Sequence, residues 1–324
     1  MKAILCRAFG PPEQLDVAEV ETPTPEAGQI VIAVKACAVN FPDTLVIQGK
    51  YQFQPPLPFS PGTDVAGVVQ ALGAGVEGLH IGDRVLALVP HGGYAEAVAC
   101  GARAAAIIPA SVDFVTAAAF QLTYSTSYHA LVDRAGIQPG ETLLVLGASG
   151  GVGLAAVELG KLLGARVIAA ASSAQKLEVC RQYSPDEVID YSAEDLRERL
   201  KALAPSGVDV VYDPVGGALA EPALRSVGWK GRYLVIGFAA GDIPRIPLNL
   251  PLLKGYSIVG VFYGAFIMRE SQRSQANMRR LLAWLAEGQI KPLVSRTYPL
   301  ERAADALNAI LEREATGKLV LVTE

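Results

Sequence analysis

The chain has 324 residues, of which 51% are hydrophobic and 19% charged, so it is long enough to bury a large core and to form two domains. Its net charge of −4 and the lack of a basic stripe argue against a nucleic-acid partner. The four cysteines are scattered without a Cys-x-x-Cys pair, which argues against a disulfide scaffold or a cysteine-rich zinc lobe. No apolar run reaches the length of a membrane span, and the first residues do not resemble a signal peptide. We therefore expect a cytoplasmic protein without membrane contact.

Residues 1 to about 110 are predicted to be rich in β-strands, because Pro and Gly repeatedly interrupt short apolar runs. One short helix is expected between Pro42 and Gly49. The strands expected here are residues 30–39, 65–72, 84–89 and 94–99.

From about Ala118, apolar strand patterns alternate with helical ones, which is typical of a doubly wound parallel sheet with strands buried on both faces. The six predicted strands are residues 143–146, 167–171, 187–190, 208–212, 232–236 and 257–261. The last part of the chain is predicted to hold a helix at 275–287, a strand at 293–298, a helix at 301–313 and a strand at 318–323.

A glycine-rich loop, Val-Leu-Gly-Ala-Ser-Gly-Gly-Val-Gly at residues 145–153, follows the first of these strands and precedes a helix at 154–163. Glycines permit the tight turn, the approach of backbone N–H groups to a pyrophosphate and the packing of helix on sheet. A purely structural turn would also use glycine, but the strand-to-helix context favours dinucleotide binding. We predict that Gly150, Gly151 and Val152 contact the cofactor.

The choice of nucleotide depends on the end of the second strand. A ribose with a free 2′-OH is usually met there by Asp or Glu. This chain instead has Ser172, Ser173 and Lys176, whose hydroxyls and ammonium group suit a 2′-phosphate. Tyr191, after the third strand, is placed to reach the same phosphate. Ordinary helix capping by Ser172 or Ser173, with a solvated Lys176, is the alternative. We predict NADPH rather than NADH.

Five stretches carry a family resemblance: Ala38-Val39-Asn40-Phe41-Pro42-Asp43, Pro61-Gly62-Thr63-Asp64-Val65-Ala66-Gly67, Gly82-Asp83-Arg84-Val85, the loop of residues 147–153, and Val211-Tyr212-Asp213-Pro214-Val215-Gly216-Gly217. Together they resemble the medium-chain dehydrogenase/reductase superfamily, and most of all its zinc-independent quinone oxidoreductase branch. The resemblance implies an α/β fold with a GroES-like β domain, residues 1–120 completed by 264–324, and a Rossmann domain, residues 121–263. It also implies a homodimer that pairs through residues 246–261.

This sequence differs from the zinc-dependent relatives at the positions that bind the metal. Those enzymes place Cys at the position of Asn40 and His at the position of Thr63, and they carry a four-cysteine lobe that is absent here. The histidines His80, His91 and His129 show no paired ligand spacing. We therefore expect no metal site.

Without zinc, nothing in the sequence replaces the group that stabilises an alkoxide. A quinone or enone is less demanding, since hydrogen-bond donors suffice for the charge that develops on its carbonyl oxygen. The resemblance implies that Asn40 donates its amide to that oxygen, that Tyr51 donates or relays a proton, and that Thr126 lies beside the nicotinamide. A turn asparagine, a packed aromatic ring and a packed helix are the respective alternatives. Asp43 is expected to order its loop.

Three aromatic residues follow the last two predicted strands of the sheet. Phe238 comes after the fifth strand, at the carboxyl edge where cofactors bind, and Phe262, with Tyr263, comes after the sixth. They would wall the nicotinamide site, with core packing as the alternative. The predicted function is NADPH-dependent reduction of quinones or similar conjugated carbonyl compounds. Reduction of the C=C bond of enals, enones or enoyl thioesters is the nearest alternative, and a non-catalytic NADPH-binding sensor or structural protein is an alternative of another class.

Overall fold

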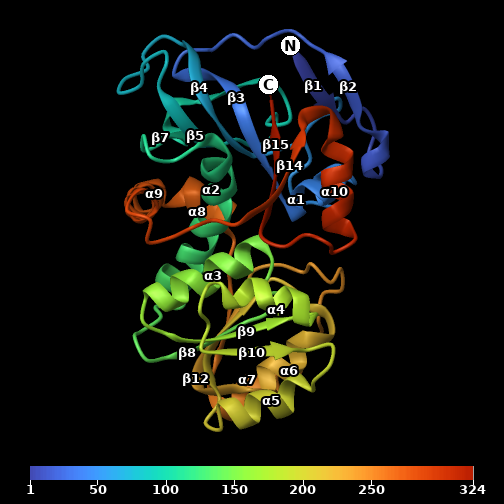
Figure 1. The fold of residues 1–324 in the computed structure, drawn as a ribbon, viewed down its shortest axis with the longest axis vertical. Helices are drawn as coiled ribbons and strands as arrows, with labels where there is room; N and C mark the ends of the chain where they lie inside the picture. The colour runs from blue at the N-terminus through green and yellow to red at the C-terminus, as the bar shows by residue number, and fades with distance from the viewer. Residues whose placement is uncertain (324) are drawn as a thin grey trace. The chain divides into compact units, whose positions relative to one another are not determined.

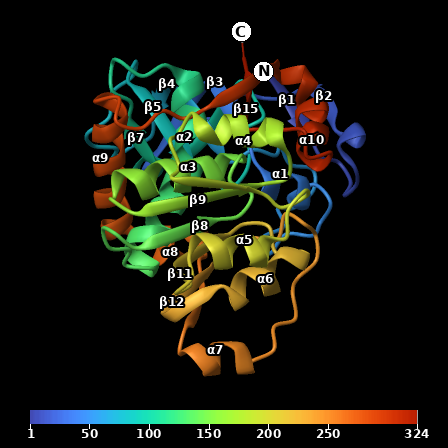
Figure 2. The ribbon, with the colours of Figure 1, turned by 60° about the horizontal axis from the view of Figure 1, so that its bottom comes forward.

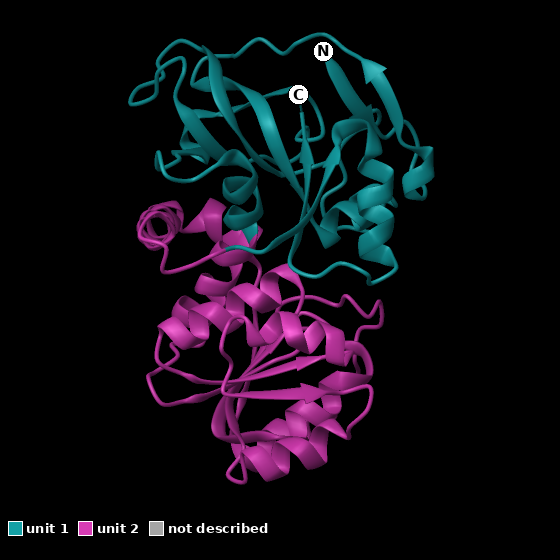
Figure 3. Ribbon diagram, in the orientation of Figure 1, with its two compact units in different colours: residues 1–122, 292–324 teal, residues 123–291 magenta. Residues whose placement is uncertain are grey.

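The computed structural model describes residues 1–323, which divide into two compact units (Figure 3). Unit 1 comprises residues 1–122 and the C-terminal segment from residue 292, and unit 2 comprises residues 123–291. Within the described residues, no helix is both long and apolar enough to cross a membrane.

Unit 1 is built around a sheet in the order β14-β15-β3-β4-β5-β7, with β6 also paired to β3 (Figure 1). The long central strand β3 (Gln29–Val39) buries Ile30, Ile32 and Val34, because β-branched side chains pack well on a pleated surface. The other strands are β1 (Lys2–Leu5), β2 (Asp16–Glu19), β4 (Asp64–Leu72), β5 (Arg84–Leu88), β6 (Ala97–Gly101), β7 (Ala105–Ile107), β14 (Val294–Pro299) and β15 (Lys318–Val322), and the helices are α1 (Phe41–Val46) and α10 (Ala303–Leu311).

The strands predicted at 30–39, 65–72 and 84–89 correspond to β3, β4 and β5. The strand predicted at 94–99 is displaced, since β6 begins only at Ala97. Tyr94 is fully buried, and its carbonyl accepts a hydrogen bond from the N–H of Ile4 at 2.8 Å. The apolar pattern there reflects burial of a turn against β1 rather than a longer strand.

Unit 2 contains a fully parallel six-stranded sheet in the order β10-β9-β8-β11-β12-β13. All six predicted strands are present, although β12 begins five residues earlier than expected. Helices α3 and α4 lie on one face and α5 and α6 on the other (Figure 2). The elements are β8 (Thr142–Val145), α3 (Gly151–Leu162), β9 (Arg166–Ala171), α4 (Ala174–Arg181), β10 (Glu187–Asp190), α5 (Leu196–Leu203), β11 (Val208–Asp213), α6 (Ala220–Arg225), β12 (Val227–Val235), α7 (Asn249–Lys254) and β13 (Ser257–Gly260).

The C-terminal boundary of unit 2 differs from the predicted return at residue 264. Helices α8 (Tyr263–Arg269) and α9 (Ser271–Ala286) belong to unit 2. The His129 ring, in a π-helical continuation of α2 (Phe114–Tyr128), stacks on Phe266 at 3.8 Å between centroids. Asp133 in the same continuation accepts hydrogen bonds from Arg273 and Asn277. These contacts hold residues 264–291 to unit 2.

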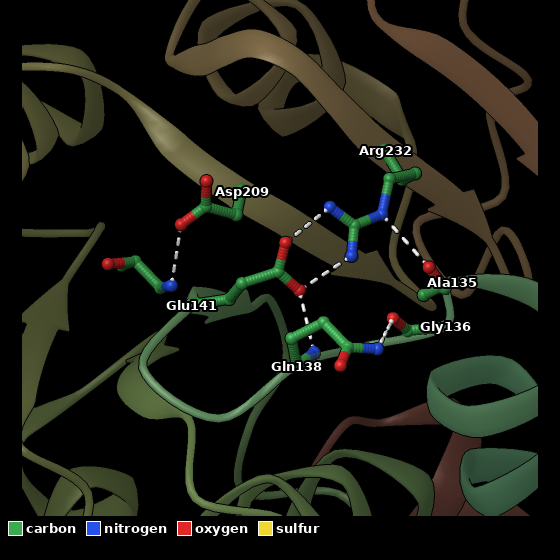
Figure 4. Close-up of polar contacts among 7 residues, drawn as sticks. Ala135, Gly136, Gln138, Glu141, Asp209 and Arg232 are labelled. Atoms are coloured by element: carbon green, nitrogen blue, oxygen red, sulfur yellow. Dashed lines mark hydrogen bonds and ion pairs between the residues drawn. The ribbon is translucent and has the colours of Figure 1, made fainter.

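A polar network fixes the turn that leads into β8 (Figure 4). Arg232 on β12 donates two hydrogen bonds to Glu141, at 2.7 and 2.8 Å, and a third to the carbonyl of Ala135. Glu141 also accepts from the N–H of Gln138, and Asp209 on β11 accepts from the N–H of Thr142. β8 is therefore tied to its neighbours before it reaches the glycine loop.

Replacing Glu141 by Gln is expected to lower the free energy of unfolding at pH 7 by about 1–2 kcal/mol, because a partly shielded bidentate pair is lost. The Arg232 guanidinium lowers the pKa of Glu141 below its ordinary 4.5, so this stabilisation is present above that value and is lost as the pH falls through the lowered pKa. Urea unfolding at pH 7 and pH 3 measures the difference, which should shrink at pH 3. Glu221→Gln, in an exposed pair with Arg225, is the control. An equal difference at both pH values would contradict the prediction.

Candidate functional site

The glycine loop joins β8 to α3 at the carboxyl edge of the unit 2 sheet. Gly147 has a φ of +57°, and a Cβ there would lie 2.8 Å from the Val215 side chain. A Cβ on Gly153 would lie 2.3 Å from the carbonyl oxygen of Gly147, so both positions require glycine. Gly150 caps α3, and Gly151 and Val152 form its first turn. N–H groups of a first turn lack partners within the helix and suit a pyrophosphate.

The strand order reverses between β8 and β11, which is where nucleotides bind in such sheets. The loop after β11 is fixed by Asp213, whose carboxylate accepts from the N–H groups of Val215 at 2.7 Å and Gly216 at 2.9 Å. Phe238, after β12, is partly exposed. Its ring lies against Gly216 in the loop after β11, where an added Cβ would come within 2.9 Å of the ring. The structure thus places Phe238 at the edge that carries the glycine loop.

The residues predicted to bind a 2′-phosphate gather at the ends of β9 and β10. Ser173 caps α4 by accepting a hydrogen bond from the N–H of Lys176, which is the capping alternative. The Lys176 ammonium donates to the Ser172 hydroxyl at 3.3 Å. Tyr191 is held nearby by a hydrogen bond from its N–H to the carbonyl of Ala171. A hydroxyl and an ammonium group therefore lie together at the end of β9, and the backbone of Tyr191 lies beside that strand end.

Thr126 lies in α2 and is 9% exposed. Its neighbour Ser127 contacts the carbonyl of Val152 at 3.0 Å and the hydroxyl of Tyr212 at 2.9 Å, which fixes this turn of α2 against α3 and β11. Part of the hydroxyl-rich run therefore serves internal packing. Thr126 therefore lies one residue from Ser127, which contacts the first turn of α3.

The two aromatic residues after β13 differ in their surroundings. Tyr263 is buried within ring-contact distance of His129 and Phe266, so the packing alternative holds for it. Phe262 precedes α8 and is 58% exposed, so its ring is available to a ligand.

Unit 1 contains a buried polar centre, formed by Asn40, Asp43, Asp64, Tyr94 and Lys318. Asp43 accepts hydrogen bonds from the N–H of Asn40 at 2.8 Å and from the Tyr94 hydroxyl at 2.9 Å, and so orders the loop as expected. Lys318 donates to the side-chain oxygen of Asn40 and to the carbonyl of Val39. Asn40 is the N-cap residue that precedes α1, and its amide nitrogen donates to the carbonyl of Ala38 at 3.3 Å.

Burial dominates the electrostatics of this centre. It raises the pKa of Asp64 to about 7 and that of Asp43 to about 6, while the charge of Lys318 lowers both. Burial lowers the pKa of Lys318, and the two carboxylates oppose that shift. Tyr51 is half-buried, and burial and the charge of Asp43 raise its pKa, so it keeps its proton at neutral pH.

The three histidines lie in separate surroundings. His80 is exposed beside Asp83, His91 lies near the Phe53 and Phe59 rings, and His129 contacts Asp133. Within residues 1–323, no three His, Cys, Asp or Glu side chains are grouped so that they could hold a metal ion.

Sequence reasoning missed Lys318, which lies 278 positions from Asn40. The one local signal is a lysine that begins an otherwise apolar strand, Lys-Leu-Val-Leu-Val. That pattern shows burial but does not identify a partner.

Comparison with known proteins supports the two-unit fold. Residues 26–113 match the alcohol dehydrogenase GroES-like domain, and residues 151–287 match the zinc-binding dehydrogenase family. The chain is 37% identical to a quinone oxidoreductase-like protein 2 homolog of Nematostella vectensis, over 100% of this chain and 89% of that protein. It is 32% identical to human quinone oxidoreductase, over 99% and 98%. Escherichia coli quinone oxidoreductase complexed with NADPH has a TM-score of 0.94 at 32% identity, over 99% and 100%. The predicted α/β fold, with a GroES-like domain and a Rossmann sheet, is confirmed.

Proposed function

Because this chain belongs to the quinone oxidoreductase branch of the medium-chain dehydrogenase/reductase superfamily, we propose that it uses NADPH to reduce quinones or similar conjugated carbonyl compounds. The observation that carries the proposal is the corner after β9, where Lys176 and Ser172 lie together and no carboxylate follows the strand. These donors fit a 2′-phosphate. Gly150, Gly151, Val152, Thr126, Phe238 and Phe262 are proposed to hold the remainder of the cofactor.

The residues of unit 1 are proposed to act on the acceptor. Bound NADPH supplies the hydride. The Asn40 amide donates a hydrogen bond to the carbonyl oxygen on which negative charge develops. Tyr51 is protonated at neutral pH and donates its proton to that oxygen. We propose that no zinc takes part, since an amide at Asn40 and a hydroxyl at Thr63 are poor ligands compared with thiolate and imidazole.

The cellular setting is proposed from the cysteines. Cys6, Cys37, Cys100 and Cys180 are buried free thiols, as expected in a reducing compartment. We place the enzyme in the cytoplasm, acting on a small molecule rather than on nucleic acid.

The purified protein is expected to oxidise NADPH in the presence of quinones, as followed by absorbance, and faster than with 2-alkenals or an enoyl-CoA. Asn40→Ala should lower kcat by about 100-fold, the cost of removing one donor to a developing oxyanion. The control is Asn308→Ala, at an asparagine of α10 whose side chain donates a hydrogen bond to Glu13. Tight NADPH binding without quinone turnover would overturn the proposal. Transfer of deuterium from labelled NADPH to a substrate carbon would identify a C=C reductase instead.

Lys176→Met is expected to weaken NADPH binding by about 10–100-fold and to leave NADH binding unchanged, because only the 2′-phosphate meets the ammonium group. Isothermal titration calorimetry with both nucleotides measures this. Lys161→Met on α3, where Lys161 pairs with Asp186, controls for loss of a charge. Tighter binding of NADH than of NADPH by the unaltered protein would contradict the assignment.

We also propose a homodimer formed through β13, which ends the sheet order of unit 2 and pairs there with β12. The N–H of Val261 bonds the carbonyl of Val235, so by alternation Ile258 directs its backbone groups away from β12. Leu248, Leu252 and Leu253, on and beside α7, are 69–80% exposed. An open edge next to exposed apolar residues suits a second copy, which pairs with it about a two-fold axis.

Analytical ultracentrifugation should therefore give twice the monomer mass of 34.0 kDa. The double substitution Leu252→Glu and Leu253→Glu should yield monomers, since it puts two charges into the apolar contact. Ile81→Glu, at an exposed apolar residue of unit 1, should leave the dimer intact. A monomeric unaltered protein would rule out this interface.

A further inference from the structure

The proposed reaction assigns no step to Lys318. It begins β15 and is 6% exposed, although lysine is rarely buried and its desolvation is costly. β15 pairs antiparallel with β3, with Leu319 opposite Val39 and Val320 opposite Ala38. This register brings Lys318 to the end of β3, where the chain turns into α1.

The ammonium group of Lys318 points at an amide rather than at a carboxylate. Within the described residues, its hydrogen bonds run to the side-chain oxygen of Asn40 at 2.5 Å and to the carbonyl of Val39 at 2.8 Å. Asp43 and Asp64 balance its charge through space. The register of two strands therefore aims a buried cation at the residue proposed to bind the acceptor.

The contact between Lys318 and Asn40 determines which end of the Asn40 amide faces the ammonium group. An ammonium group has only donors, so it can bond only the oxygen end of an amide. The nitrogen end is then left to donate, and of its two N–H groups one is used by the carbonyl of Ala38. The other meets the carboxylate of Asp64, and an acceptor carbonyl would share this donor. A charge-assisted bond to the oxygen also polarises the amide and strengthens its N–H as a donor.

We propose that Lys318 is a positioning residue for Asn40, whose ammonium group keeps the amide nitrogen directed at the acceptor and strengthens its hydrogen bond as charge develops on the carbonyl oxygen. This inference rests on the proposed function. Lys318 acts through the amide and does not touch the acceptor.

A double-mutant cycle tests the coupling. Lys318→Met, which keeps the length of the side chain, should lower kcat for a quinone by about 10-fold, less than loss of the donor itself, and change NADPH affinity by less than about twofold. In the Asn40→Ala background, the same substitution should change kcat by less than about twofold. Equal losses in both backgrounds, or no loss with Asn40 present, would overturn the inference. Lys2→Met, at an exposed lysine paired with Glu301, is the control.

Loss of a buried cation leaves Asp43 and Asp64 without a counter-charge, so a second variant is needed. Lys318→Met combined with Asp64→Asn removes one charge of each sign and keeps the net charge of the centre. The same 10-fold loss of kcat is expected against Asp64→Asn alone. A combined variant as active as Asp64→Asn would again overturn the inference.

Nuclear magnetic resonance of the side-chain amides separates this inference from the proposed function. The Asn40 amide signal should shift in Lys318→Met, while that of Asn308 should not. An unchanged Asn40 signal in an enzyme that reduces quinones overturns the inference alone. A protein that binds NADPH but reduces no quinone overturns the proposed function, and the role of Lys318 with it, even when the Asn40 signal shifts.

Discussion

The antiparallel pairing of β15 with β3 is the constraint on which the chemistry of unit 1 depends. It joins the last strand of the chain to the longest strand near its start, in a register that sets Val320 opposite Ala38. Leu319 and Leu321 are almost fully buried in the core of unit 1, and Val320 between them is buried as well. The register of this pairing places Lys318 beside Asn40.

The polar centre is stabilised by opposite charges, although its two carboxylates outnumber its one ammonium group. Two buried carboxylates and one ammonium group would each be costly alone. Asp43 accepts from Asn40 and Tyr94, and Asp64 accepts from the N–H of Leu122. Lys318 supplies the positive charge that both carboxylates lack. Such a centre holds its side chains in one arrangement, because each group that moves leaves a buried partner without a hydrogen bond.

Unit 2 prepares its site through the backbone rather than through charge. The reversal of strand order between β8 and β11 leaves space at the carboxyl edge, and glycines at positions 147 and 153 allow the chain to approach closely there. Asp213 and the Glu141–Arg232 pair hold the loops and strands around this edge. The two units thus differ, since the backbone forms the glycine loop in unit 2 while buried charges surround the Asn40 amide in unit 1.

The sequence by itself determined the elements whose signals are local. The alternation of apolar strands and helices and the glycine loop could be predicted, and a helix cap at Ser172 or Ser173 was an expected alternative, because each depends on neighbours within a few positions. Only the tertiary structure decided that residues 264–291 pack with unit 2, that Tyr94 is a core residue outside a strand, and that Lys318 contacts Asn40. Periodicity reports which side chains are buried but not against what, because the partner of a strand is chosen by contacts across hundreds of residues.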